Sequence, residues 1–192
     1  MMLLPYKTRD WKSNIPYHIM SRSNWKERLF REEEDFQYFF HLLEQTSHKY
    51  PFQLNSFIFM QTHFHMLIKS DNLHYSHIMY TVKKQYAEYY NRKYTLRGHL
   101  FDKRFIVKPA YSQRTILIMS RYIHYNPVEI NLVRKPEDYK WSSYPLLLKA
   151  DLNVEKDLHL PSFIDFKPLL NPFKGTNNEK RKKYIQWCSK AY

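Results

Sequence analysis

The sequence has little cysteine and no long apolar run. Its only cysteine, Cys188, excludes an internal disulfide and any zinc site built from several cysteines. No apolar run approaches the roughly 20 residues that a membrane span requires. Residues 1–9 are too short and too polar for a signal peptide. We therefore expect a soluble, cytoplasmic protein with a reduced thiol and no membrane partner.

Positive charge and aromatic rings are both abundant. The chain holds 31 Lys and Arg residues against 18 Asp and Glu, a formal net charge of +13. Such an excess attracts polyanions, and nucleic acid is the usual one. Aromatic residues make up 18% of the chain, and rings among cations suit single strands, because bases stack on the rings while Lys and Arg hold phosphates. Most of these rings must nevertheless form an ordinary core.

The 192 residues suffice for one domain of ordinary size. Apolar spacing and turn signals predict the element order strand, helix, two strands, helix, strand, helix. This order predicts an α+β layer fold, in which helices flank a central antiparallel sheet. Gly98 breaks the second helix, and Pro127 lies just past the end of the third. The predicted elements are a strand at 17–21, a helix at 33–50, strands at 52–60 and 63–69, a helix at 75–94, a strand at 105–107 and a helix at 113–125.

Two histidines lie on the strand predicted at 63–69. His63 and His65 are separated by one apolar residue, so their side chains point to the same face of the strand. One strand can present two imidazoles to one metal ion in this way. The pair alone is a weak signal, since the chain has 10 histidines, and both residues could have structural roles.

The helix predicted at 113–125 ends in a second constellation. Tyr122 and Asn126 are neighbours at i and i+4, whereas His124 faces elsewhere and is a poorer candidate ligand. A tyrosine near a metal ion suggests phosphoryl transfer with the phenol as nucleophile, because the metal spreads the charge that develops on the phosphate. Asn126 could supply a third ligand. Alternatively, Tyr122 is one of many packed tyrosines and Asn126 is a helix C-cap before Pro127.

Five short motifs occur in order along the chain. They are Tyr17-His18-Ile19 with Arg22 and Asn24, Met60 to Leu67, Gly98-His99-Leu100-Phe101 with Arg104-Phe105, Arg121 to Val128, and Trp141-Ser142-Ser143-Tyr144. In this order they resemble the single-tyrosine HUH transposases of bacterial insertion sequences, and especially the branch of REP-associated tyrosine transposases. The resemblance covers about residues 15–148. Thr62 is a departure, since this branch usually has Asn directly before the first histidine, although a hydroxyl can also hydrogen-bond locally.

The resemblance implies a fold, a reaction and a substrate. The fold is the HUH variant of the ferredoxin-like or RRM-like layer fold, with a catalytic domain at 1–150 and a C-terminal extension at 151–192. His63, His65 and Asn126 would bind Mg²⁺ or Mn²⁺, and Tyr122 would be the nucleophile. The reaction would cleave and rejoin single-stranded DNA through a 5′-phosphotyrosine. Substrates would be hairpin-forming palindromic repeats, and the protein would act as a monomer or a homodimer.

Basic residues outside this constellation are candidates for phosphate contacts. We expect the extension to end in a basic helix at 179–192. This helix either grips a DNA stem, covers the active site or forms a solvated face. Arg104 is the strongest candidate because it lies in a family-like segment. The candidates are Lys83, Lys84, Arg92, Arg97 and Arg104.

Two other functions remain open at this point. The first is a non-catalytic, domesticated protein that binds single-stranded or hairpin nucleic acid on the same scaffold. The second is a metal-dependent hydrolase, in which water attacks and Tyr122 is structural. The histidine pair and Asn126 beside Tyr122 argue against simple binding, and a covalent DNA–protein adduct would exclude hydrolysis by water.

Overall fold

The structure, a computed structural model, describes residues 11–24, 28–149 and 160–190. Its centre is a four-stranded antiparallel sheet in the order β2-β3-β1-β4. The predicted α+β fold with helices flanking an antiparallel sheet is therefore confirmed. The strands are β1 (Pro16–Arg22), β2 (Gln53–Met60), β3 (His63–Lys69) and β4 (Ile106–Pro109). The helices are α1 (Glu33–Lys49), α2 (Tyr75–Lys93), α3 (Gln113–Glu129), α4 (Ser143–Lys149), α5 (Lys167–Leu170) and α6 (Asn177–Lys190).

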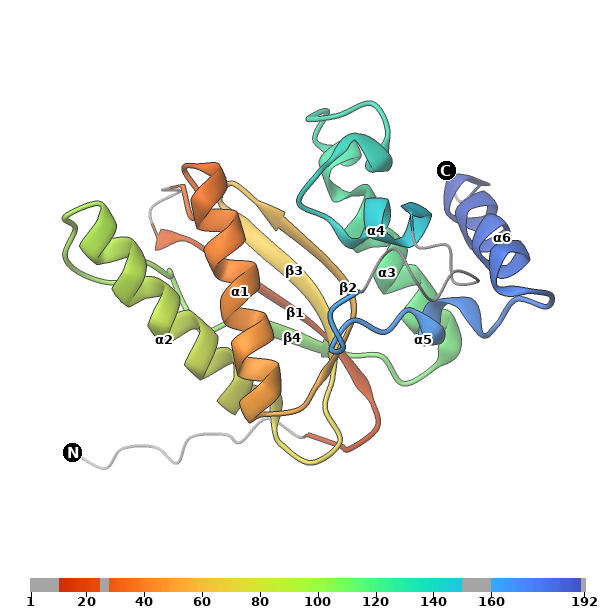
Figure 1. Ribbon diagram of the computed structural model, residues 1–192, viewed down its shortest axis with the longest axis horizontal. Helices are drawn as coiled ribbons and strands as arrows, with labels where there is room; N and C mark the ends of the chain where they lie inside the picture. Colours follow the sequence, from red (N-terminus) through yellow and green to blue (C-terminus); the bar gives the residue numbers. More distant parts are fainter. Residues whose placement is uncertain (1–10, 25–27, 150–159, 191–192) are drawn as a thin grey trace.

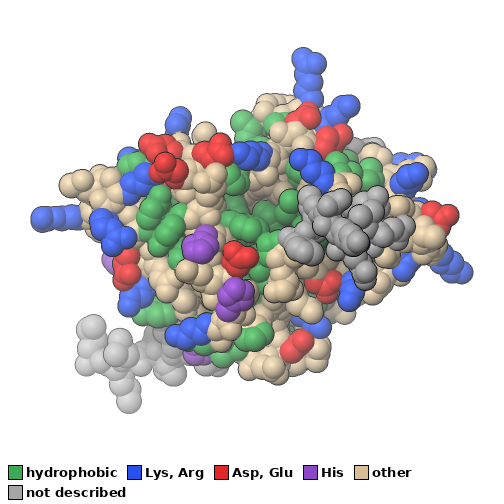
Figure 2. All heavy atoms as spheres, viewed as in Figure 1, with side chains coloured by type: hydrophobic (Ala, Val, Ile, Leu, Met, Phe, Trp, Pro, Cys, Tyr) green, Lys and Arg blue, Asp and Glu red, His purple; other side chains and the backbone are tan. Residues whose placement is uncertain are grey.

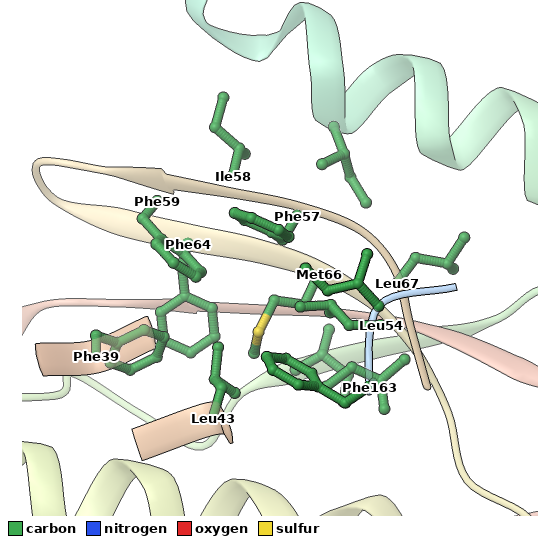
Figure 3. Packing of buried hydrophobic residues seen from close by; sticks show 14 of the residues in the cluster. Phe39, Leu43, Leu54, Phe57, Ile58, Phe59, Phe64, Met66, Leu67 and Phe163 are labelled. Atoms are coloured by element: carbon green, nitrogen blue, oxygen red, sulfur yellow. The ribbon is translucent and has the colours of Figure 1, made fainter. Parts of the chain in front are cut away.

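The helices form two layers, one on each face of the sheet. α1 and α2 cover one face, and α3 to α6 lie on the other side (Figure 1). The aromatic core lies between the sheet and α1. There the centroid of the Phe39 ring lies 5.0 Å from that of Phe64 and 5.1 Å from that of Phe59. Figure 3 shows Phe39 and Leu43 on this side of the sheet, whereas Ile58 points to the opposite side.

A buried carboxylate fixes α2 against α1. Asp35 is fully buried in the first turn of α1, where its side chain accepts a hydrogen bond from the backbone N–H of Glu32. It also accepts hydrogen bonds from the Tyr94 hydroxyl at 2.7 Å and from Lys93 at 3.0 Å, both at the end of α2. One carboxylate therefore caps α1 and joins the two helices of this layer.

The third helix does not end before the proline. α3 runs through Pro127 to Glu129, so the predicted end at Tyr125 is wrong. A proline in the last turn removes one N–H from the helix but leaves the preceding turns intact. The Pro127 carbonyl still accepts hydrogen bonds from the backbone N–H groups of Leu132 and Val133. Asn126 is therefore a buried residue inside the helix and not its C-cap.

The remaining differences are one shifted strand and two short helices. β4 covers 106–109 where 105–107 was predicted, and the helices α4 at 143–149 and α5 at 167–170 were not predicted. The basic terminal helix exists as α6, which begins two residues earlier than expected. Residues 191–192 and the predicted domain boundary at 150 lie outside the described part of the chain. Within that part, no helix is both long and apolar enough to span a membrane.

A buried chain of polar groups attaches α6 to α3. The Tyr184 hydroxyl lies 2.6 Å from Ser120 Oγ and 3.0 Å from His124 Nδ1. His124 Nε2 lies 2.8 Å from Ser143 Oγ on α4, which in turn accepts a hydrogen bond from the Phe57 N–H of β2. Because buried polar groups are costly when unpaired, this chain fixes where α3 lies over the sheet.

The polar chain predicts that Tyr184→Phe destabilises the fold by about 1–3 kcal/mol, because the change removes the hydroxyl that Ser120 Oγ and His124 Nδ1 share as a hydrogen-bond partner. Urea unfolding followed by circular dichroism would measure the loss. Tyr80→Phe is the matched control, since the Tyr80 side chain is 67% exposed. Equal unfolding free energies for the two variants would contradict a structural role for this network.

Candidate functional site

The histidine pair lies on the face of β3 that meets α3. Phe64, between the two histidines, is fully buried on the α1 side, so His63 and His65 point the other way. Their ring centroids are 5.1 Å apart. The register with β1 pairs Arg22 with His63 and Met20 with His65. The shared face predicted for the two histidines is therefore confirmed.

Asn126 on α3 contacts His63 on the face of the sheet that α3 covers. Its Oδ1 atom lies 3.3 Å from His63 Nε2, and the amide is buried where α3 packs over β2 and β3. On the other side of the same ring, the Thr62 hydroxyl lies 3.1 Å from His63 Nδ1. A hydroxyl can donate or accept, so Thr62 fits either tautomer of His63.

Tyr122 lies one helical turn before Asn126 and covers the second histidine. Its ring centroid is 5.4 Å from that of His65, and the two rings are nearly perpendicular. The side chain is 40% exposed, so the phenol is open to a large ligand. The structure thus brings together all four residues of the predicted constellation. His124 points away from them, into the buried polar chain, as its helical position indicated.

A third histidine, His18 on β1, completes the site. Its Nε2 atom lies 2.9 Å from His65 Nδ1, and its ring centroid lies 5.8 Å from that of Tyr122. Sequence reasoning placed His18 in a strand and in a family-like motif but gave it no role. The signal that could have found it is the antiparallel pairing of Met20 with His65, which places His18 on the same face of the sheet.

The three imidazoles lie in surroundings that favour their neutral form. Burial, followed by the charges of His18 and His63, lowers the pKa of His65 to about 2. Burial, followed by the nearby Lys108 ammonium, lowers the pKa of His18 to about 4. Burial also lowers the pKa of His63, although its hydrogen bond with Asn126 opposes the shift. Neutral imidazoles have lone pairs that can bind a metal ion or accept hydrogen bonds.

His63, His65 and Tyr122 line a cavity of about 700 Å³. One wall carries Arg22, whose Nε and Nη2 atoms donate hydrogen bonds to Asp102 at 3.1 and 2.9 Å. Arg22 and Asn24 belong to a family-like motif, but the sequence did not identify them as part of a site. The cavity is lined by Met20, Arg22, Ser23, Asn24, Thr62, His63, His65, Asp102 and Tyr122.

Most of the predicted phosphate contacts lie away from this cavity. Lys83, Lys84 and Arg92 are on α2, which covers the opposite face of the sheet (Figure 1). Lys83 donates a hydrogen bond to the Lys103 carbonyl, and its Nζ atom lies 4.4 Å from the centroid of the Phe101 ring. Phe101 and Lys103 are the sequence neighbours of Asp102, which lines the cavity. Arg97 follows α2 and Arg104 precedes β4, and both are exposed. Their role in DNA binding stays a prediction.

On the face seen in Figure 2, lysine and arginine side chains stand mainly around the rim, and no single basic patch dominates the centre. The net charge of +13 is therefore not concentrated at the centre of this face.

Comparisons with known proteins show a family match and a similar fold. A family model described as IS200-like transposase matches residues 11–126. A solved REP-associated tyrosine transposase bound to a REP hairpin has a similar fold, with a TM-score of 0.65 and 16% identity over 83% of this chain and 96% of that one. A crystal structure provisionally described as a transposase from Deinococcus radiodurans gives a TM-score of 0.44 and 16% identity over 62% and 95% of the two chains. A search among curated proteins finds no match.

Buried neutral histidines predict that stability falls as the pH falls. His65 is 4% exposed and His124 is fully buried, and burial lowers the pKa of His124 to about 3. An unfolded histidine has a pKa near 6.5, so below this pH the unfolded chain binds protons that the folded chain excludes. Between pH 6 and 5, the free energy of unfolding should fall by up to about 1.4 kcal/mol per pH unit for each such imidazole.

Urea titrations at several pH values would measure this slope. His65→Asn should remove from this slope the contribution of about one proton. His77→Gln serves as the control, because His77 is exposed on α2. Identical slopes for His65→Asn and the natural chain would show that His65 is protonated in the folded state.

Proposed function

Because the chain belongs to the IS200-like transposase family, we propose that it cleaves and rejoins single-stranded DNA with Tyr122 as the nucleophile. The observation that supports this most strongly is the position of the phenol. Tyr122 lies against His65, one helical turn from the Asn126 amide that meets His63. A packed structural tyrosine would not need to be exposed at a cavity lined by two histidines.

The donor atoms in the cavity fit one divalent cation. Two ligands that bind Mg²⁺ at about 2.1 Å and at a right angle lie about 3 Å apart, close to the 3.3 Å between His63 Nε2 and Asn126 Oδ1. His65 would contribute its Nε2, since its Nδ1 faces His18. Among the described residues, no three His, Cys, Asp or Glu side chains form a metal-binding group. We propose the amide oxygen of Asn126 as the third donor.

Mg²⁺ or Mn²⁺ held by His63, His65 and Asn126 would polarise the scissile phosphate and stabilise the charge that develops on it. The ligand set also leaves room for phosphate oxygens and water, which both ions accept. Thr62 would orient the His63 imidazole through its second ring nitrogen. A hydrogen-bond partner on the second nitrogen is a common feature of metal-binding histidines.

Cleavage would exchange one phosphoester bond for another. The phenol oxygen of Tyr122 attacks the phosphorus, the bond to the 3′ oxygen breaks, and the strand downstream of the break stays attached to the tyrosine through its 5′ phosphate. The phenol proton passes to water, and the released 3′ oxygen takes up a proton. Since the phosphotyrosine keeps an ester bond, the 3′-hydroxyl of another strand can reverse the step without ATP.

We place the DNA strand on the open half of the sheet beside Tyr122. There β1 pairs with β4, so that Met20 lies beside Ile106 and His18 beside Lys108. Ile106 is 52% exposed, and Lys108 is also exposed. This part of the sheet therefore presents an apolar surface next to a cation. Bases stack on or pack against such surfaces while cations hold the phosphates. Among the described residues, Arg22 bonds Asp102 through Nε and Nη2, so its Nη1 could donate to a phosphate in the cavity.

The REP hairpin in the similar solved structure suggests the substrate class. We expect this chain to bind DNA hairpins from palindromic repeats and to cut the single strand that flanks the stem. The hairpin would fix the position of the flanking strand, so that only one phosphate reaches Tyr122. Binding energy from the stem would thereby serve to orient the reacting phosphate.

Tyr122→Phe should abolish covalent capture of hairpin DNA and leave binding nearly unchanged, because only the nucleophilic oxygen is lost. The assay is an SDS-resistant complex with labelled hairpin DNA in Mn²⁺. Tyr80→Phe, exposed on α2, is the matched control. EDTA or His63→Ala should also remove the adduct. An undiminished adduct in Tyr122→Phe would move the nucleophile to another tyrosine, and Tyr125 is the nearest along the chain.

Lys108→Ala should weaken hairpin binding more than Lys84→Ala does. Lys108 lies on the proposed path, whereas Lys84 is on the opposite layer and pairs with Glu88 at 4.0 Å. Removing one phosphate contact on a single strand should reduce, by about 0.7, the slope of the logarithm of the binding constant against the logarithm of the salt concentration. A salt titration of both variants measures this. A larger loss from Lys84→Ala would place the DNA on the α2 side.

A further inference from the structure

His18 and His65 contact each other directly through their side chains. The two side chains meet nitrogen to nitrogen at 2.9 Å, with their rings inclined by 25° and their centroids 5.1 Å apart. A neutral imidazole has one N–H and one bare nitrogen, so this contact can be a hydrogen bond in which only one of the two rings donates. The direction of that bond determines which nitrogen of His65 carries its proton.

The direction decides whether His65 can bind a metal ion. If His65 Nδ1–H donates to His18 Nε2, then His65 Nε2 is a bare lone pair. If His18 donates instead, His65 Nε2 carries the proton and cannot be a ligand. Metal-binding histidines usually donate their other N–H to a carboxylate, a carbonyl or a water molecule. Among the described residues, His18 Nε2 is the only group with a hydrogen bond to His65 Nδ1.

His18 also contacts the proposed nucleophile. Its ring meets that of Tyr122 at 5.8 Å and 69°, while the His65 ring meets Tyr122 at 5.4 Å and 89°. The Tyr122 ring therefore lies against two imidazoles that are joined to each other. Edge-to-face contacts of this kind favour one ring orientation. A change at His18 would thus disturb both the ligand and the tyrosine.

We propose that His18 is a positioning residue, which accepts a hydrogen bond from His65 Nδ1–H and so keeps His65 Nε2 unprotonated for the metal ion. This role rests on the proposed function, because it presumes that His65 is a ligand. An uncharged acceptor holds the tautomer of His65 without adding a negative charge beside the incoming phosphate. The backbone of β1, paired with β3, keeps the two rings in register.

Two variants separate positioning from packing. His18→Leu replaces the imidazole with an apolar side chain of similar size and so removes the acceptor. His18→Gln keeps an acceptor that can reach the place of Nε2. Mn²⁺ affinity, measured by titration calorimetry on the full chain, should fall by about 10- to 100-fold in His18→Leu and recover largely in His18→Gln. Thermal unfolding of both variants reports whether the fold is retained, and His77→Leu on the exposed face of α2 controls for loss of a histidine.

The tautomer itself can be observed without metal. Long-range ¹⁵N–¹H correlation spectra of histidine-labelled protein should show His65 with its proton on Nδ1 in the natural chain, and a loss of that preference in His18→Leu. A proton on His65 Nε2, or equal Mn²⁺ affinities for the natural chain and a folded His18→Leu, would overturn the proposal. A natural chain that binds no Mn²⁺ would instead overturn the proposed metal-dependent function, while the spectra would still decide the direction of the hydrogen bond.

Discussion

The alternation of side chains along β3 is the constraint on which the rest of the structure depends. Phe64 and Met66 point into the core under α1, while His63 and His65 point to α3. A shift of one residue in register would exchange the two sets, exposing the phenylalanine and burying the histidines in the aromatic core. The core thus fixes the site, because the hydrophobic residues that hold β3 in register also decide which face carries the imidazoles.

The second half of the site comes from α3, and its position depends on residues far along the chain. Tyr122 and Asn126 occupy the face of α3 that meets the sheet, and Ser120 and His124 occupy the face that meets α6 and α4. The fully buried Tyr184 attaches α6 to α3. The C-terminal helix is therefore a support for the helix that carries the tyrosine, in addition to any contact that its lysines make with DNA.

The sequence predicted the parts of the site that depend on local spacing. His63 and His65 are two apart on a strand, and Tyr122 and Asn126 are four apart on a helix, so each pair follows from periodicity. Family-like motifs connected the two pairs. The contact of His18 with His65 depends on the pairing of β1 with β3, which joins residues 47 apart in the chain, and no local pattern reports that register. Pro127 misled the prediction because the last turn of a helix tolerates a missing N–H. The buried role of Tyr184 was hidden because its neighbours Lys182 and Lys183 suggest a solvated face.

The central claim is that the Tyr122 oxygen forms the bond to DNA. The most direct measurement is mass spectrometry of the protein after reaction with hairpin DNA, nuclease trimming and tryptic digestion. Cleavage after Arg121 and Arg134 gives one peptide, residues 122–134, which holds both Tyr122 and Tyr125. We predict fragment ions that place the residual 5′-phosphonucleotide on Tyr122. Its location on Tyr125, or on any other peptide, would contradict the account.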